Sequence, residues 1–141
     1  MTNHVSELDE LLDEKVTACG DFLSATLLLK AALETEEMTV VDRQLGRRQE
    51  LMGVIDGVDR RIGQCRRPVP PEKKRRIATL SEDLKRILGQ IASANGDCDA
   101  VASRRCEGLR NELIVINRKE EGLQGYARGG QRTAKFLNIR T

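Results

Sequence analysis

Residues 77–98 read IATLSEDLKRILGQIASANGDC. Apolar side chains recur here at spacings that alternate between three and four residues, which is the heptad pattern of a helix packed against other helices. The positions are Ile77, Leu80, Leu84, Ile87, Ile91, Ala94 and Cys98. The pattern predicts an amphipathic helix with one continuous apolar seam.

A second apolar stripe follows this seam in a shifted frame. Its members are Cys98, Ala102, Cys106, Leu109, Leu113, Ile116, Leu123 and Ala127. Steps of four residues from Ala94 to Cys106 join the two frames, and such a stutter locally unwinds a left-handed supercoil. Asn95-Gly96-Asp97 falls at the stutter and indicates a local kink. We expect one helix from Ile77 to Ala127, about 75 Å long at 1.5 Å per residue, and a helix of that length needs a partner.

The preceding sequence offers that partner as a first arm with its own apolar stripe. The stripe comprises Leu8, Leu12, Val16, Cys19, Leu23, Leu27, Val41, Leu45, Leu51, Met52, Ile55, Val58, Ile62 and Cys65. Ser6 is the expected N-cap, with Asp9 as a weak capping box, and Arg48 interrupts the stripe. Gly20-Asp21 and the polar segment from Leu33 to Thr39 are candidate bends. The sequence leaves open whether the arm is one helix or is broken at either place.

Arg67-Pro68-Val69-Pro70-Pro71 is the clearest break in the chain, because proline lacks an amide donor and restricts the residue before it. The arms on either side, residues 6–66 and 71–127, have similar lengths. An all-α fold follows, as a long antiparallel helical hairpin or coiled-coil-like bundle. We expect a single domain at 1–127 with its turn at 67–70, and a basic, flexible tail at 128–141.

Composition agrees with this architecture and limits the location of the protein. The chain has 141 residues, a third of them charged, and aromatic residues make up only 2%, which is typical of long amphipathic helices rather than of a compact globular core. Residues 1–39 are acidic and residues 59–76 are basic. No segment approaches the roughly 20 apolar residues of a membrane span, and no signal peptide is visible. We therefore expect a soluble, cytoplasmic protein with reduced cysteines.

Residues for catalysis or for metal and cofactor binding are lacking in the sequence. His4 is the only histidine, which makes a catalytic triad improbable. The cysteines show no zinc-ligand spacing, and a hairpin turning near Val69 would set Cys19 beside Lys119, Cys98 beside Val40 and Cys106 beside Ala32. The glycine pair near the end of the chain does not open a phosphate-binding loop. We expect no enzyme, no metal and no cofactor.

Two features of the sequence, a basic cluster near the turn and a group of apolar residues in the tail, each allow more than one interpretation. The basic cluster Lys73 to Arg76 is a candidate nucleic-acid patch, although a solvated helix start is favoured because no aromatic residue lies nearby. In the tail, Phe136, Leu137 and Ile139 either dock back onto the helices or form an interaction motif that folds on a partner.

Taken together, the arms and the tail resemble the FlgN-type flagellar export chaperones. The similar positions are Ala32-Leu33, Asp42, Leu45, Arg48, Leu51-Met52 and Ile55 in the first arm, and Leu109-Arg110-Asn111-Glu112-Leu113-Ile114 in the second. Tyr126, the following Gly129-Gly130 and the basic end also fit the family. Where the family has a pair of asparagines, this chain has Asn111 followed by Glu112.

This resemblance implies a cytosolic chaperone that binds the terminal helix of hook–filament junction proteins and delivers them to the type III export gate. It also implies that the late stripe and the tail bind the client, and that Tyr126 docks at the gate. The expected partner-binding residues are Leu109, Asn111, Leu113, Ile116, Leu123, Tyr126, Phe136, Leu137 and Ile139. The alternatives are a structural coiled-coil subunit, as a homo-oligomer or stalk of a secretion apparatus, and a nucleic-acid binder through the basic cluster.

Overall fold

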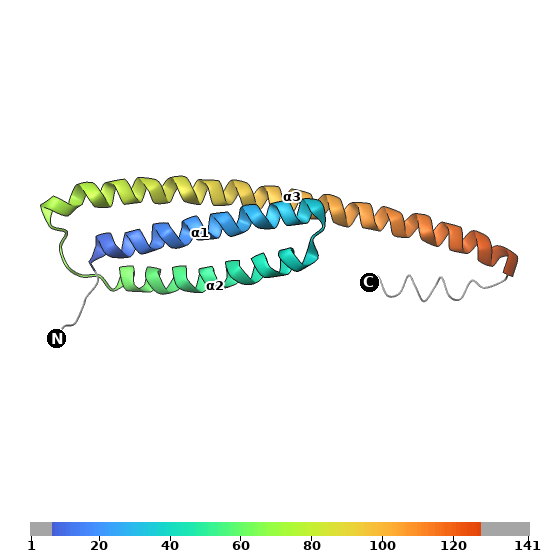
Figure 1. Cartoon of the computed structure of the whole chain (residues 1–141), viewed down its shortest axis with the longest axis horizontal. Helices are drawn as coiled ribbons and strands as arrows, with labels where there is room; N and C mark the ends of the chain where they lie inside the picture. The colour runs from blue at the N-terminus through green and yellow to red at the C-terminus, as the bar shows by residue number, and fades with distance from the viewer. Residues whose placement is uncertain (1–6, 128–141) are drawn as a thin grey trace. The chain divides into compact units, whose positions relative to one another are not determined.

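A computed structural model describes residues 7–127 of the chain, and the side chains among them as far as Leu123. Over this range the regular structure is helical throughout (Figure 1). The elements are α1 (Leu8–Thr35), α2 (Met38–Gly63), the short 3₁₀ helix η1 (Pro71–Lys73) and α3 (Lys74–Ala127). The predicted all-α class is confirmed.

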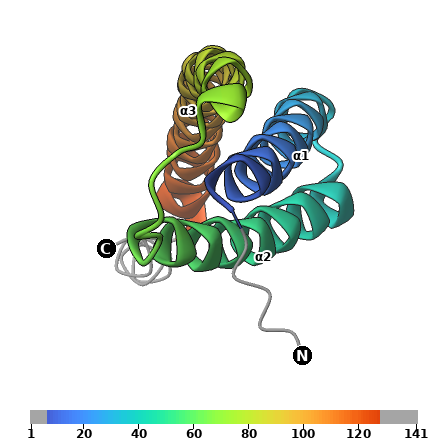
Figure 2. The ribbon, with the colours of Figure 1, turned by 90° about the vertical axis from the view of Figure 1, so that its left-hand side faces the viewer.

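The chain divides into two compact units, Met1–Val101 and Ala102–Thr141. The boundary between these units lies inside α3, and the expected domain at 1–127 stays a prediction. The first unit contains α1, α2 and the first half of α3 as a three-helix bundle, which Figure 2 shows end-on. The expected tail lies outside the described residues.

Ion pairs fix the directions of the three helices in the bundle. Lys15 Nζ lies 2.6 Å from Asp59 Oδ1, whereas Arg61 near the end of α2 contacts Glu14 near the start of α1, so α1 and α2 are antiparallel. Arg76 near the start of α3 lies 3.2 Å from Asp9 near the start of α1, and Asp97 further along α3 lies 3.5 Å from Lys30 near the end of α1, so α1 runs parallel to α3. The sequence left open whether the first arm is one helix or is broken, and the structure shows a break after Thr35 at which the chain reverses, so the arm is itself a hairpin of two helices.

The reversal between α1 and α2 lies in the polar segment that the sequence marked as a bend. Glu36 adopts the left-handed conformation (φ 58°, ψ 33°), and its backbone N–H donates to the Ala32 carbonyl. The Thr35 hydroxyl donates to the Glu37 carboxylate at 2.7 Å. Without apolar side chains to extend the stripe, the chain turns back here, whereas α1 continues through Gly20.

The beginning of α1 also differs from its expected form. The N-cap residue is Glu7 in place of Ser6, and no side chain caps the helix. The carboxylates of Glu7 and Asp9 contact the Lys73 ammonium instead. The predicted capping box is therefore wrong, because these acids serve an ion-pair cluster between helices.

The predicted seam of α3 is the side of this helix that faces the bundle. Leu80, Ile87, Ala94 and Cys98 are buried, and Ile77, Leu84 and Ile91 are half-buried. Val101 is also buried at 5% exposure, so the heptad spacing continues one step further than predicted. The helix passes through Asn95-Gly96-Asp97 without interruption.

The core consists of small clusters in which the three helices meet. Phe22 and Ala25 of α1 pack with Leu51 of α2 and with Ile91 of α3. A second cluster joins Leu29, Ala32, Val41 and Cys98, and the Cys98 thiol donates to the Thr26 carbonyl at 3.6 Å.

This packing tests the predicted cysteine register. The placement of Cys98 near Val40 is confirmed, because Val40 packs against the cluster that contains Cys98. Ala32 packs with Cys98. The register expected for Cys19 and Cys106 assumed that the whole first arm runs antiparallel to α3, and this assumption is wrong for α1, which runs parallel to α3 within the first unit.

Helix α1 contains an 18-residue window that is long and apolar enough to cross a membrane. This finding corrects the expectation that no segment approaches such a span. Part of the window, 39%, is buried in the structure, and a core helix of a soluble protein has the same length and composition.

Candidate partner-binding surface

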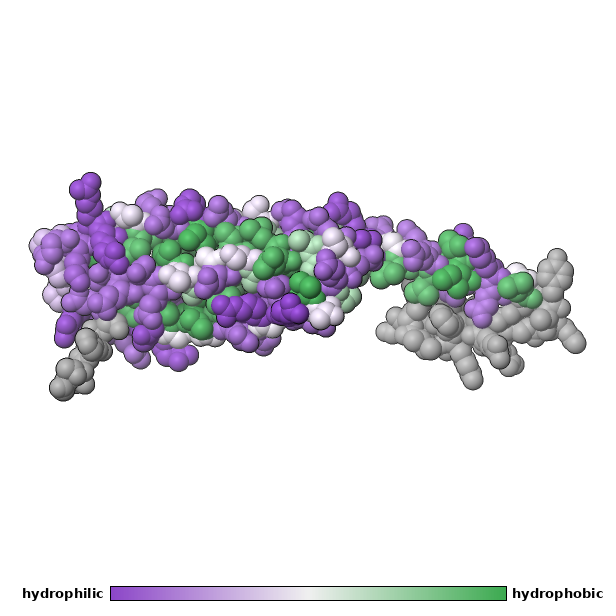
Figure 3. Space-filling model, in the orientation of Figure 1, coloured by the Kyte–Doolittle hydropathy of each residue, from purple (hydrophilic) through white to green (hydrophobic). Residues whose placement is uncertain are grey.

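The most conspicuous exposed apolar surface of the second unit lies on α3 beyond Val101. We define the late stripe as the residues Leu109, Leu113, Ile116 and Leu123. Leu109, Ile116 and Leu123 are spaced by seven residues and are 57%, 53% and 72% exposed, respectively, while Leu113 is half-buried. Figure 3 shows an apolar patch in this segment. An α-helix with so much exposed leucine and isoleucine is typical of a surface that another helix covers.

The late stripe is not a continuation of the seam that holds α3 in the bundle. Continued past Val101 at heptad spacing, the seam would fall on Arg105, Gly108 and Glu112, which are not core residues. Each residue of the late stripe lies one position after a position of the continued seam, and this is the shift that the predicted stutter produces. The residues that pack against α1 and α2 are thus a different set from those exposed near the end of α3.

A shallow depression of about 390 Å³ lies beside the late stripe, lined by Asn111, Glu112, Val115 and Ile116. Asn111, one of the predicted site residues, is exposed there. Val115 was not among the predicted residues but is 48% exposed. Val115 falls in the heptad frame of the seam continued past Val101, where the preceding positions are Arg105, Gly108 and Glu112. Because those positions are not apolar, the periodicity did not indicate Val115.

The positions that flank the late stripe carry more positive than negative charge. The charged residues at these heptad positions are Arg105, Arg110, Glu112 and Lys119, and all four are exposed. Flanking charges of this kind select the charge of a partner helix.

The remaining predicted site residues lie outside what the structure describes. The backbone of Tyr126 belongs to α3, but its side chain is not described. Phe136, Leu137 and Ile139 fall after residue 127. Of the predicted set, the structure places Leu109, Asn111, Leu113, Ile116 and Leu123 together on one helix.

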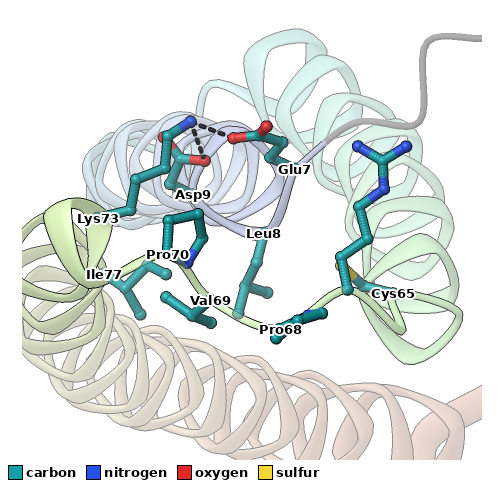
Figure 4. Close-up of a pocket in the computed structure, with 10 residues that line it drawn as sticks. Glu7, Leu8, Asp9, Cys65, Pro68, Val69, Pro70, Lys73 and Ile77 are labelled. Carbon is teal, nitrogen blue, oxygen red and sulfur yellow. Dashed lines mark hydrogen bonds and ion pairs between the residues drawn. The ribbon is translucent and has the colours of Figure 1, made fainter.

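A second feature, which the sequence did not reveal, is a cavity of about 230 Å³ at the turn between α2 and α3. We call it the turn pocket. Its lining residues are Glu7, Leu8, Asp9, Cys65, Arg67, Pro68, Val69, Pro70, Lys73 and Ile77. They come from the start of α1, the α2–α3 loop and the start of α3 (Figure 4). Because these segments are distant in the sequence, no local motif could have indicated the pocket.

A cluster of opposite charges borders the turn pocket. The Lys73 ammonium contacts the carboxylates of Glu7 and Asp9, and Arg76 Nε lies 3.2 Å from Asp9 Oδ2. Burial on its own would raise the pKa of Asp9, but the hydrogen bond and the charge of Lys73 outweigh it and lower that pKa. The hydrogen bond to Glu7 raises the pKa of Lys73.

These contacts also bear on the basic cluster at the start of α3. Lys73 and Arg76 are engaged by acids of α1, including Asp13 at 3.4 Å from Arg76. Lys74 and Arg75 are exposed. Two of the four cations are thus partly neutralised within the bundle, which reduces the attraction of this cluster for phosphate.

The four cysteines are free and occupy different environments. Cys19 and Cys98 are buried, Cys65 is partly exposed at the turn pocket, and Cys106 is exposed. Burial raises the pKa of the Cys19 and Cys98 thiols. Within residues 7–127, no group of three histidine, cysteine or acidic side chains is placed to hold a metal ion.

With this geometry described, the chain can be compared with known proteins. No protein-family model, no curated protein and no solved structure matches it.

Proposed function

We propose that the protein is a cytosolic export chaperone of the FlgN type. It binds the terminal helix of hook–filament junction proteins and delivers them to the export gate. The observation that carries this proposal is the late stripe, in which Leu109, Ile116 and Leu123 are each more than half exposed. The sequence resemblance described above supports the same function.

The physical basis is helix capture. A client helix laid along the late stripe would remove these side chains from water, and full burial of a leucine or isoleucine stabilises by about 1.5–3 kcal/mol. Because the side chains are already partly covered, roughly half of that gain is available for each. The client's own apolar stripe would be covered at the same time, which prevents premature assembly.

The two units of the chain have different roles in this proposal. The bundle has its own core of buried residues such as Leu11, Phe22 and Leu51, and it holds the first half of α3. The late stripe, which this core does not use, is left for the client. Tyr126, near the end of α3, is the residue proposed to dock at the export gate.

Calorimetric titration with the purified hook–filament junction proteins of the same organism tests the proposal. Ile116→Asp should weaken binding at least about tenfold, or 1.4 kcal/mol, because the client would bury an unpaired charge. Leu88→Asp is the matched control, since Leu88 is 45% exposed on the same helix but lies outside the late stripe. Equal affinity of both variants and the wild type would refute the proposed surface, and so would the absence of wild-type binding.

The same exposed heptad spacing favours one alternative, self-association as a structural coiled coil. Light scattering of the purified protein separates the two functions. A monomer that forms a complex with the client supports the chaperone. A stable dimer or larger oligomer that Ile116→Asp dissociates, together with a lack of client binding, would support the structural role.

A further inference from the structure

The turn pocket has an apolar wall that the fold holds in place. Figure 4 shows Leu8 pointing toward the loop of Pro68 and Val69, with Ile77 on one side and Cys65 on the other. Proline fixes its own φ and restricts the preceding residue, so the loop has little freedom to collapse inward. The pocket is therefore preformed, and a ligand would lose little free energy in ordering it.

The two cations of the turn pocket differ in their availability. Lys73 is held by Glu7 and Asp9. Arg67 also lines the pocket, it is exposed, and no residue from 7 to 127 forms an ion pair with it. A guanidinium presents a planar fork of donors that matches a carboxylate. Arg67 is thus a free anion-binding group beside an apolar wall.

The acidic residues of the lining do not cancel this preference. The charged residues of the lining are two carboxylates, Glu7 and Asp9, and two cations, Lys73 and Arg67. Both carboxylates are paired with Lys73, and Asp9 also contacts Arg76, which is itself paired with Asp13. Arg67 is the charged group of the lining that has no ion pair within residues 7–127, so it is the group available to an anion.

The volume of the turn pocket limits the size of what it can hold. At about 230 Å³, it exceeds the roughly 150 Å³ of a cavity that binds benzene. It is smaller than the roughly 300 Å³ at which pockets for drug-sized ligands begin. One benzyl or branched aliphatic group with a carboxylate attached fits these limits.

We propose that the turn pocket binds an apolar group that carries a carboxylate, with Arg67 holding the carboxylate and Leu8, Val69 and Ile77 contacting the apolar group. Two sources share this chemistry: the C-terminal residue of a peptide and a small free aryl or aliphatic acid. The site lies in the first unit, shares no residue with the late stripe, and is independent of the proposed function.

Cys65 allows the site to be tested without a labelled ligand, because this residue lines the pocket and is partly exposed. The rate of iodoacetamide modification of each cysteine is followed by mass spectrometry in the full-length protein. N-acetyl-phenylalanine, which ends in a carboxylate, should slow modification of Cys65. N-acetyl-phenylalaninamide, the matched neutral probe, should have little effect. Cys106, which is exposed in the second unit, should react at an unchanged rate with either probe.

A third probe, 3-phenylpropanoate, distinguishes the two sources. Protection by both carboxylates supports the shared chemistry. Protection by N-acetyl-phenylalanine alone assigns the pocket to a peptide C-terminus, and protection by phenylpropanoate alone assigns it to a small acid. Equal protection by the neutral amide, equal slowing at Cys106, or no protection by any probe would overturn the proposal.

Substitutions test whether the protection of Cys65 depends on the proposed contact between Arg67 and the carboxylate. Arg67→Gln should weaken the protection about tenfold, because a charge-assisted bidentate contact is lost. Arg66→Gln is the matched control, since Arg66 donates to the Gly63 carbonyl and does not line the pocket. Circular dichroism would establish that both variants are folded. Unchanged protection in folded Arg67→Gln would exclude Arg67 as the carboxylate partner.

Discussion

The guanidinium of Arg48 lies over the ring of Phe22, 4.7 Å from the ring centroid. Its Nη2 atom also donates to Asn95 Oδ1 at 2.8 Å. One side chain of α2 thus contacts both α1 and α3. This explains why an arginine interrupts the apolar stripe of α2: its plane stacks on an aromatic ring and its charge has an amide partner.

The contact between Arg48 and Asn95 should appear as a coupling in the free energy of unfolding. In a double-mutant cycle, Arg48→Met and Asn95→Ala should show an interaction of about 1.5–3 kcal/mol in urea denaturation, as expected for a hydrogen bond to a charged group. Arg47→Met is the control, because Arg47 forms only exposed ion pairs. Purely additive effects of Arg48→Met and Asn95→Ala would show that the bond contributes nothing.

Asp9 should make the bundle sensitive to acid. Its pKa lies below the ordinary value of 3.8, so the folded state binds the proton less tightly than the unfolded state. Its contribution to stability is present above about pH 3.8 and is lost as the pH falls through the lower pKa of the folded state. The melting temperature of Asp9→Asn should therefore fall less between pH 5 and pH 2.5 than that of the wild type. Parallel melting curves for the two proteins over this range would contradict the ion-pair cluster.

The two stripes of α3 should respond differently to truncation. Ile87 is 8% exposed and Ile116 is 53% exposed. Ile87→Ala should lower the free energy of unfolding by about 2–4 kcal/mol, while Ile116→Ala should change it by no more than about 0.5 kcal/mol. Chemical denaturation followed by circular dichroism measures both. Similar losses in the two variants would show that Ile116 is packed within the chain and is unavailable to a client.

The four thiols should differ in reactivity under native conditions. Cys106 and Cys65 should react first with a disulfide reagent, because the thiolate is the nucleophile and these two are accessible. Cys19 and Cys98 should react much more slowly, since they are buried and their pKa values are raised. Reductant should leave the melting temperature unchanged, and a Cys98 as reactive as Cys106 would contradict the packing of α3 on α1.

Local periodicity was sufficient to predict the seam of α3. Each residue from Ile77 to Cys98 that was assigned to it is buried or half-buried, because a single helix face determines such a pattern. The late stripe was predicted for the same reason, and the exposure of Leu109 and Ile116 supports its assignment as an uncovered surface.

The path of the first arm could not be derived in this way. A bend near Glu36 was visible as a polar interruption, but whether the chain continues or reverses depends on which helices pack together. The reversal requires Glu36 in the left-handed conformation, which glycine or asparagine would have indicated and glutamate does not. The turn pocket was invisible in the sequence because residues as distant as Leu8 and Ile77 line it.

Hydrogen exchange of the protein with and without its client tests the proposed capture most directly. If the late stripe of α3 binds the terminal helix of a hook–filament junction protein, backbone amides from residues 106–123 should gain protection on complex formation. Amides of the buried seam, residues 77–101, should change little because they are already packed in the bundle. Protection confined to the bundle, or no change in residues 106–123 while a complex forms, would contradict the proposed binding surface.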